Sequence, residues 1–62
     1  MKRGDLVRYN WHDKLVTHGI VMWVSYEHTY LTFELLENDG MLCTFDVFYS
    51  DKVQPEVICE AG

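Results

Sequence analysis

The tripeptide Asn38-Asp39-Gly40 constrains the fold more than any other feature of this chain, because it lies between two segments of alternating polarity. Apolar side chains recur at every second position in residues 30–37 and again in residues 41–48. A period of two residues is typical of a strand with one buried face. An Asp-Gly pair accepts the positive φ angles of a tight turn. The sequence therefore predicts an antiparallel hairpin.

Three further segments have the composition of strands. Residues 5–9 alternate, with Val7 and Tyr9 on one face. Residues 20–26 are rich in β-branched and aromatic side chains, and residues 56–59 form a brief apolar run. Such residues are enriched in strands because they fit a pleated, half-buried surface. Together with the hairpin, these segments bring the predicted number of strands to five.

The connections between the predicted strands differ in length. Residues 10–18 show no sustained period and end at Gly19, so they predict a long loop. Residues 27–29 predict a tight turn. Residues 50–53 begin with a serine, which is a good helix cap, and they predict one short helical turn before Pro55.

These elements indicate an all-β protein with a single domain over residues 1–62. No apolar period of helical type extends over ten or more positions. Five short strands protect their edges by curling into a small barrel. The long loop after the first strand and the helical turn before the last strand favour a five-stranded barrel of the SH3-like kind.

The two-residue period also predicts which side chains form the core. We expect Val7, Val21, Leu31, Phe33, Leu35, Cys43, Phe45 and Ile58 to be largely buried. The two cysteines, Cys43 and Cys59, both lie in apolar runs, as small core residues do. We expect them to be reduced thiols rather than a disulfide, since cytosolic cysteines are normally reduced.

Four short motifs are spaced along the chain: Arg3-Gly4-Asp5-Leu6-Val7-Arg8, Gly19-Ile20-Val21, Asn38-Asp39-Gly40 and Glu56-Val57-Ile58. With these motifs the chain resembles small phage-encoded SH3-like proteins that open with a Gly-Asp-Leu-Val-Arg strand. The resemblance covers most of the chain, and it implies a fold and a viral setting rather than an activity. The first two motifs also resemble the opening of KOW-type modules of ribosomal and transcription proteins, which use basic loops against RNA.

Charge argues against nucleic acid as the partner. The chain has five Lys and Arg against ten Asp and Glu, a net charge of −5. An acidic body repels phosphate backbones, and isolated basic residues do not supply the contacts that a duplex binder needs. No apolar segment is long enough to predict a membrane span. We expect the protein to act on the virion or in the host cytoplasm.

Catalytic and metal-binding patterns are weak in this sequence. The histidines His12, His18 and His28 have no spacing typical of a zinc site, and neither cysteine is near them in sequence. A nucleophile needs a base within reach and a pocket that excludes water, whereas side chains fill the interior of so small a barrel. We expect a protein that is not an enzyme and that carries neither a metal nor a cofactor.

The aromatic residues indicate a surface for protein contacts. Two Trp, four Tyr and three Phe are more aromatic side chains than a core of this size encloses, so several are expected to be exposed. In an SH3-like barrel the first loop and the segment before the last strand lie on the same side. The expected partner-binding residues are Tyr9, Trp11, Phe48, Tyr49 and Pro55, bordered by Arg8 and Lys14.

Three functions stay open at this point. The first is a non-enzymatic phage protein that docks on other protein chains as a minor virion component, such as a capsid-decorating or connector protein. The second is a phage-encoded inhibitor or adaptor that binds a host protein, for which an acidic body suits mimicry of a nucleic-acid surface. The third is a nucleic-acid-binding barrel of the KOW kind. The first two predict protein partners, among which a second copy of the chain is included.

Overall fold

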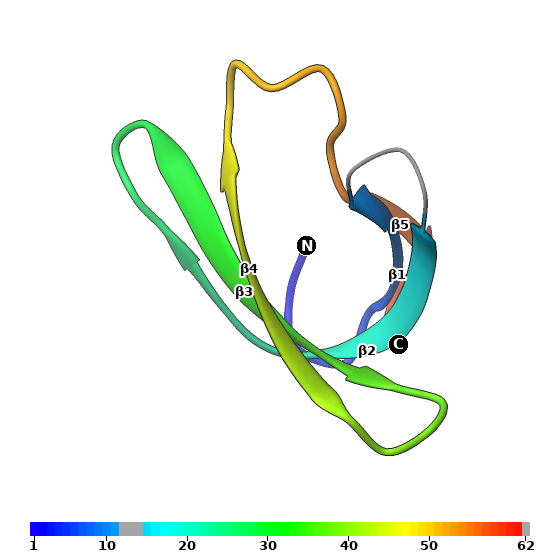
Figure 1. Ribbon diagram of the computed structural model, residues 1–62. Coiled ribbons are helices and arrows are strands. Elements are labelled where there is room, and N and C mark those ends of the chain that lie inside the picture. Colours follow the sequence, from blue (N-terminus) through cyan, green and yellow to red (C-terminus); the bar gives the residue numbers. More distant parts are fainter. Residues whose placement is uncertain (12–14, 62) are drawn as a thin grey trace.

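Five antiparallel strands form one sheet in the computed structural model, which describes residues 1–11 and 15–61, with side chains at 1–10 and 17–61 (Figure 1). The strands are β1 (Leu6–Trp11), β2 (Leu15–Tyr26), β3 (Tyr30–Glu37), β4 (Leu42–Phe48) and β5 (Glu56–Cys59). Their order across the sheet is β4-β3-β2-β1-β5. The predicted all-β class with five strands is confirmed. The described residues include no helix of the length and apolar character that crossing a membrane requires.

The turn between β3 and β4 forms where the sequence predicts it. Gly40 has a φ of 84°, in the left-handed region, and its N–H donates to the Glu37 carbonyl at 2.9 Å. The Glu37 N–H donates to the Met41 carbonyl at 2.9 Å, and the Met41 N–H donates to Asp39 Oδ1 at 3.0 Å. The Asp side chain and the flexible glycine therefore close this hairpin, as their residue types indicate.

The long loop predicted at residues 10–18 is wrong for residues 10–11 and 15–18, which belong to strands; residues 12–14 lie outside the described part of the chain. β1 continues to Trp11 and β2 begins at Leu15, and the two strands pair without interruption from Leu6↔Ile20 to Trp11↔Leu15. The two strands pair although the sequence of this segment lacks a regular alternation of polar and apolar residues. β2 is the longest strand, and it curves from its place beside β1 to its place beside β3 (Figure 1).

A β-bulge in β2 changes which of its side chains face the core. The register with β3 shifts between Val21, which pairs with Leu35, and Trp23, which pairs with Glu34. A bulge places one extra residue in a strand and reorients the side chains that follow. Val21 is buried before the bulge, whereas Trp23 after it is 42% exposed.

The helical turn predicted at residues 50–53 is not confirmed. The chain after β4 makes a turn in which the Asp51 N–H donates to the Phe48 carbonyl at 3.0 Å. The Asp51 carboxylate accepts a hydrogen bond from the Phe48 N–H at 3.1 Å. Gln54 Nε2 donates to the carbonyls of Phe48 and Asp51 at 2.9 and 2.8 Å. These side chains bind backbone groups of residues 48 and 51.

The core lies on the inner face of the sheet and is close to the prediction. The buried hydrophobic side chains are Val7, Tyr9, Val21, Leu31, Phe33, Leu35 and Val47. Five of the predicted core residues are among them, which confirms the two-residue period in β1 and β3. Cys43 and Phe45 on β4 are half-buried, whereas Val47 on the same face of that strand is fully buried.

The prediction for β5 is wrong by one residue. Ile58 is 48% exposed, and Val57 packs against the core in its place. The register between β1 and β5 shifts at this point, since Leu6 pairs with Cys59 and Val7 pairs with Val57. A one-residue change of register exchanges the inner and outer faces of a strand. For the same reason Cys59 is an exposed thiol rather than a core residue, and both cysteines are free.

The two ends of the chain meet at the carboxylate of Asp5, which is 2% exposed. Asp5 Oδ1 accepts a hydrogen bond from the Ala61 N–H at 2.8 Å, and Oδ2 accepts one from the Lys2 N–H at 2.9 Å. The hydrogen bond from Ala61 contributes most to lowering the pKa of Asp5, with help from the N–H and the charge of Lys2, and burial opposes them in part. Asp5 in its charged form therefore holds the N-terminal turn and the C-terminal segment together.

Stability is expected to fall in acid because of Asp5. Its folded pKa lies below the ordinary value of 3.8, so its contribution is present above that pH and is lost as the pH falls through the folded pKa. Melting temperatures measured by circular dichroism from pH 6 to about pH 2 should show this loss. Asp5→Asn is expected to melt lower than wild type at neutral pH and to lose less stability in acid. Glu60→Gln at an exposed position is the control, and an Asp5→Asn curve parallel to wild type would contradict the assignment.

Candidate protein-docking surface

Large hydrophobic side chains are exposed at nine of the positions whose side chains the structure describes. They are Ile20, Trp23, Tyr26, Leu36, Met41, Leu42, Phe48, Tyr49 and Ile58. Single exposed hydrophobic residues are normal, whereas contiguous ones mark contact sites. The strand register shows which of these residues are neighbours across the sheet. Together with the position of Tyr49, which directly follows Phe48 in the chain, it defines two groups.

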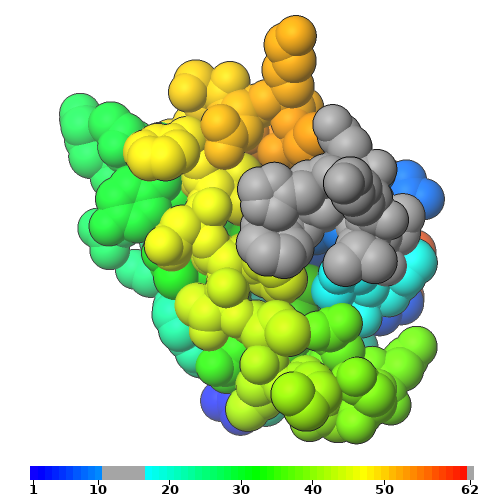
Figure 2. All heavy atoms as spheres, in the orientation of Figure 1, coloured from blue at the N-terminus to red at the C-terminus, as the bar shows by residue number. Residues whose placement is uncertain are grey.

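The first group, which we name the aromatic patch, consists of Tyr30, Phe48 and Tyr49. Tyr30 and Phe48 are directly opposite each other on β3 and β4, and their ring centroids are 5.9 Å apart in an edge-to-face arrangement. Phe48 is 53% exposed and Tyr49 is 45% exposed. In Figure 2 the yellow atoms at the end of β4 lie against the green atoms around the start of β3. The patch therefore presents aromatic surface to solvent at one end of the sheet.

Hydrogen bonds hold the aromatic patch in place. The Tyr49 hydroxyl donates to the Glu27 carbonyl at 2.7 Å, and the Tyr49 N–H donates to the Thr29 carbonyl at 3.1 Å. These two bonds join the turn after β4 to the turn between β2 and β3. Asp51 and Gln54 bind both backbone groups of Phe48, as described above. The two turns beside the patch are thus tied to each other, in part through the Tyr49 side chain itself.

Several predicted site residues do not join this patch. Tyr9 is 7% exposed and packs edge-to-face on Phe33 and Phe45, with ring centroids 5.6 and 5.2 Å apart. Its place in the core follows from the alternation that puts Tyr9 on the same face as Val7. Burial, and then the negative charge of Asp51, raise the pKa of the Tyr9 hydroxyl. Tyr9 is therefore a core residue beneath the turn that carries Asp51, not a surface contact.

The remaining predicted residues have mixed placements. Pro55 is half-buried between the turn and β5. Arg8 is exposed, and its guanidinium forms an ion pair with Glu56 across β1 and β5 at 3.1 Å. Exposed pairs of this kind contribute little to stability. The side chains of Trp11 and Lys14 lie outside the part of the chain whose side chains the structure describes.

The second group, which we name the aliphatic row, crosses four strands. The register pairs Leu6 with Ile20, Ile20 with Leu36, and Leu36 with Leu42. Ile20, Leu36 and Leu42 are 38%, 36% and 54% exposed. The sequence does not predict this row, because its members come from four separate segments. The only signal in the sequence was that Leu36 and Leu42 are apolar at positions where the alternation requires an outward side chain.

Polar residues separate the aromatic patch from the aliphatic row. Thr32 and Glu34 on β3 pair with Asp46 and Thr44 on β4, and the Thr32 hydroxyl donates to Asp46 Oδ1 at 2.6 Å. Tyr30 and Leu36 are six positions apart along β3, which corresponds to roughly 20 Å at the rise of a strand. The two apolar groups are thus distinct surfaces of one copy.

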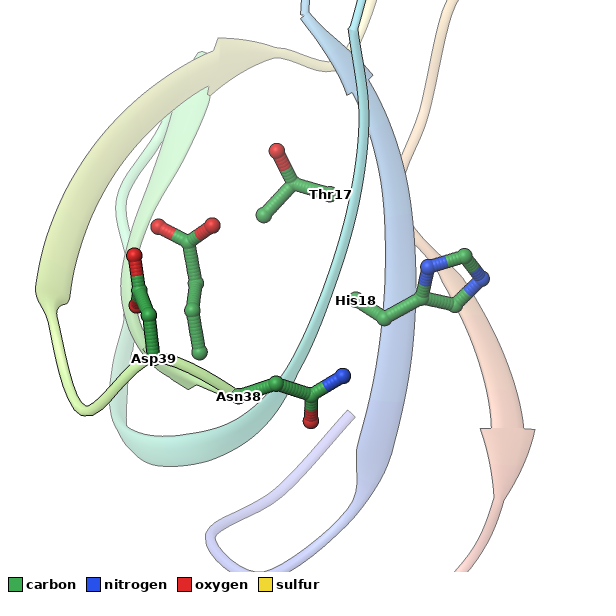
Figure 3. Close-up of a pocket in the computed structure, with 5 residues that line it drawn as sticks. Thr17, His18, Asn38 and Asp39 are labelled. Carbon is green, nitrogen blue, oxygen red and sulfur yellow. The ribbon is translucent and has the colours of Figure 1, made fainter.

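A pocket of about 270 Å³ lies at the opposite end of β3 from the aromatic patch, and it is lined by Thr17, His18, Glu37, Asn38 and Asp39. Figure 3 shows that the His18 ring points away from Thr17 and Asp39, on the other side of its strand. The imidazole therefore does not converge with the acidic residues, and no acid–base pair is assembled there. No group of three His, Cys, Asp or Glu residues in the described chain is arranged to hold a metal ion.

The Cys43 thiol beside this pocket is not an activated nucleophile. It donates a hydrogen bond to Glu37 Oε2 at 2.6 Å. This bond to a carboxylate raises the pKa of Cys43, and burial and the charges of Glu37 and Asp39 act in the same direction. Reactive cysteines need the opposite environment, one that favours the thiolate. The geometry around Cys43 is that of a protonated side chain in a structural hydrogen bond.

Comparisons with known proteins find no matching family model, no matching curated protein and no matching solved structure. The exposed aromatic and aliphatic groups are therefore the features of the molecule that point to a function.

Proposed function

We propose that this protein is a non-enzymatic docking protein and that the aromatic patch of Tyr30, Phe48 and Tyr49 is its contact surface for another protein chain. The observation that carries the proposal is the exposure of Phe48 and Tyr49, at 53% and 45%, in a chain of only 62 residues. Aromatic side chains are enriched at the energetically dominant positions of protein interfaces.

The rigidity of the patch supports this proposal. The Phe48 N–H donates to the Asp51 carboxylate, the Phe48 carbonyl accepts from Gln54, and the Tyr49 hydroxyl donates to a carbonyl of the β2–β3 turn. A contact surface that is ordered before binding loses less side-chain and loop entropy when the partner docks. The ordered backbone of Phe48 and the anchored side chain of Tyr49 are therefore suited to binding a partner.

The setting that we propose is a small SH3-like barrel that serves as a minor virion component, such as a capsid-decorating or connector protein. The sheet order supports the barrel, because the last strand, β5, returns to pair with the first, β1. The resemblance to small phage-encoded SH3-like proteins supports the viral setting. Assembly on a particle would also stabilise a chain whose own core is small, since binding to the folded state favours it.

Phe48→Ala and Tyr49→Ala are expected to weaken docking by about thirtyfold each, the effect of truncating an aromatic residue at the centre of an interface. The measurement is the amount of each variant incorporated into purified phage particles. Capture of host proteins from infected cells is the second measurement, which would assign the protein to the inhibitor or adaptor class instead. Trp23→Ala is the matched control, because Trp23 is aromatic and 42% exposed but lies outside the patch.

Circular dichroism melts should establish that each variant is folded before docking is compared. Equal docking by wild type and by both folded patch variants would exclude the aromatic patch as the contact surface. Loss of docking by Trp23→Ala alone would transfer the contact to the outer face of β2.

A further inference from the structure

The two edge strands of the sheet differ in how well they are protected against pairing with another strand. β5 has only four residues, follows Pro55, begins with a glutamate and has a register shift against β1. Short length, proline, charge and irregular register are the features that natural proteins use to protect an edge. The β5 edge is therefore a poor site for strand addition.

The β4 edge has fewer of these protective features. Its seven residues, Leu-Cys-Thr-Phe-Asp-Val-Phe, contain one charged side chain, Asp46, and no proline. Its ladder with β3 runs without a shift from Tyr30↔Phe48 to Leu36↔Leu42. Within the described part of the chain, β4 pairs with β3 alone. A regular apolar edge of this length is a template for a further strand.

The hairpin register shows which backbone groups face this open edge. The Glu37 N–H donates to the Met41 carbonyl, and backbone groups in an antiparallel ladder alternate in direction from one residue to the next. The backbone groups of Leu42, Thr44 and Asp46 therefore point away from β3. Those of Phe48 point the same way but are bound by Asp51 and Gln54, so the open edge ends at Asp46.

We propose that β4 pairs antiparallel with β4 of a second copy of this chain, about a two-fold axis at Phe45. In this register Thr44 lies opposite Asp46 of the second copy, and backbone hydrogen bonds form at these two positions. Leu42 lies opposite Phe48 of the second copy, where only the side chains meet because the Phe48 backbone is already bound. No like charges are opposed, and like charges directly across a ladder are destabilising. A threonine and Asp46 already form such a cross-strand pair within one copy, between Thr32 and Asp46 at 2.6 Å.

The pairing also joins the two exposed apolar groups. The aliphatic row ends on β4 at Leu42, and the aromatic patch reaches β4 at Phe48. In the proposed register the aliphatic row of each copy continues into the aromatic patch of the other. Self-complementarity of this kind is what a two-fold interface requires, because every contact between the two copies occurs twice, once in each direction. We assign this edge to a second copy because, in this register, polar side chains of one β4 strand face polar side chains of the other, and apolar side chains face apolar ones.

Sedimentation equilibrium over a range of protein concentrations tests the proposal. The wild-type mass is expected to rise from the monomer value of 7.3 kDa toward twice that value. Thr44→Asp places a carboxylate opposite Asp46 at two symmetric positions, and it is expected to weaken the dimer about tenfold. Thr44→Lys places an ammonium group there, and it is expected to leave the dimer as tight as wild type or tighter. The samples should contain a reductant, because Cys59 is exposed and can otherwise form a disulfide between copies.

The two substitutions introduce opposite charges at the same exposed position, which also lies opposite Glu34 of the same chain, so the stability of each variant must be compared together with its mass. Thermal melts establish that both variants fold. A wild-type protein that stays monomeric at every concentration would overturn the proposal and leave the β4 edge for a strand of another protein. A dimer that neither substitution affects would show that the contact lies elsewhere. Weakening by Thr44→Lys as well would overturn the register about Phe45. The measurement of mass is independent of docking to other proteins, so this proposal and the proposed function fail separately.

Discussion

Replacing Phe33 with alanine is expected to remove a large part of the free energy of unfolding. Phe33 is fully buried on β3, and its ring centroid lies 5.6 Å from that of Tyr9 and 5.4 Å from that of Phe45. Truncating a buried phenylalanine to alanine costs about 3–5 kcal/mol, because it removes apolar contacts and leaves a cavity. A domain of this size has roughly 3–9 kcal/mol of stability in total, at the usual value per residue.

Urea denaturation followed by circular dichroism measures this effect. Phe48→Ala is the matched control, because it removes the same side chain from a position that is 53% exposed. We expect the control to retain a cooperative transition close to that of wild type, whereas Phe33→Ala should show either a greatly lowered midpoint or no folded baseline. Similar midpoints for the two variants would show that the ring of Phe33 is not at the centre of the core.

Replacing Gly19 with alanine is expected to have the second largest effect on stability. Gly19 is buried in β2, where β2 and β3 approach closely. A Cβ atom at this position would lie 2.9 Å from the Leu35 Cβ and 2.9 Å from the Leu36 carbonyl oxygen. Neither atom belongs to the flexible end of a side chain, so relief requires the two strands to separate. Overpacking of this kind costs about 1–3 kcal/mol.

Gly40 is a second glycine at which a side chain is expected to be unfavourable, but through backbone conformation rather than through a steric clash. A Cβ atom at Gly40 would have open space around it, but the φ of 84° is one that most side chains disfavour. Asparagine tolerates this region better than alanine does. Denaturation midpoints are therefore expected to rank asparagine above alanine at position 40 and alanine above asparagine at position 19. The same ranking at both positions would contradict a steric role for Gly19.

The sequence by itself determined the strands whose neighbours are close in the chain. β3 and β4 and their turn follow from the alternation and from Asp39-Gly40, because a hairpin depends on local turn chemistry and on a period that one segment displays. The burial of Leu31, Phe33 and Leu35 follows from the same period. For the candidate site, the outward position of Phe48 was predictable in the same way, since it alternates with the apolar face that contains Val47.

Only the tertiary structure decided the features that depend on pairing between distant segments. The β1–β2 hairpin forms although residues 10–18 lack a period, because backbone pairing compensates for weak local preference. The register shift between β1 and β5 selects Val57 over Ile58 for the core, and nothing local distinguishes these two apolar neighbours. The aliphatic row can be recognised only when the registers of four strands are known. In the same way, the neighbouring positions of Tyr30 and Phe48 follow from the register between β3 and β4. Side-chain alternation is a property of one strand, whereas a surface across several strands exists only when their relative register is known.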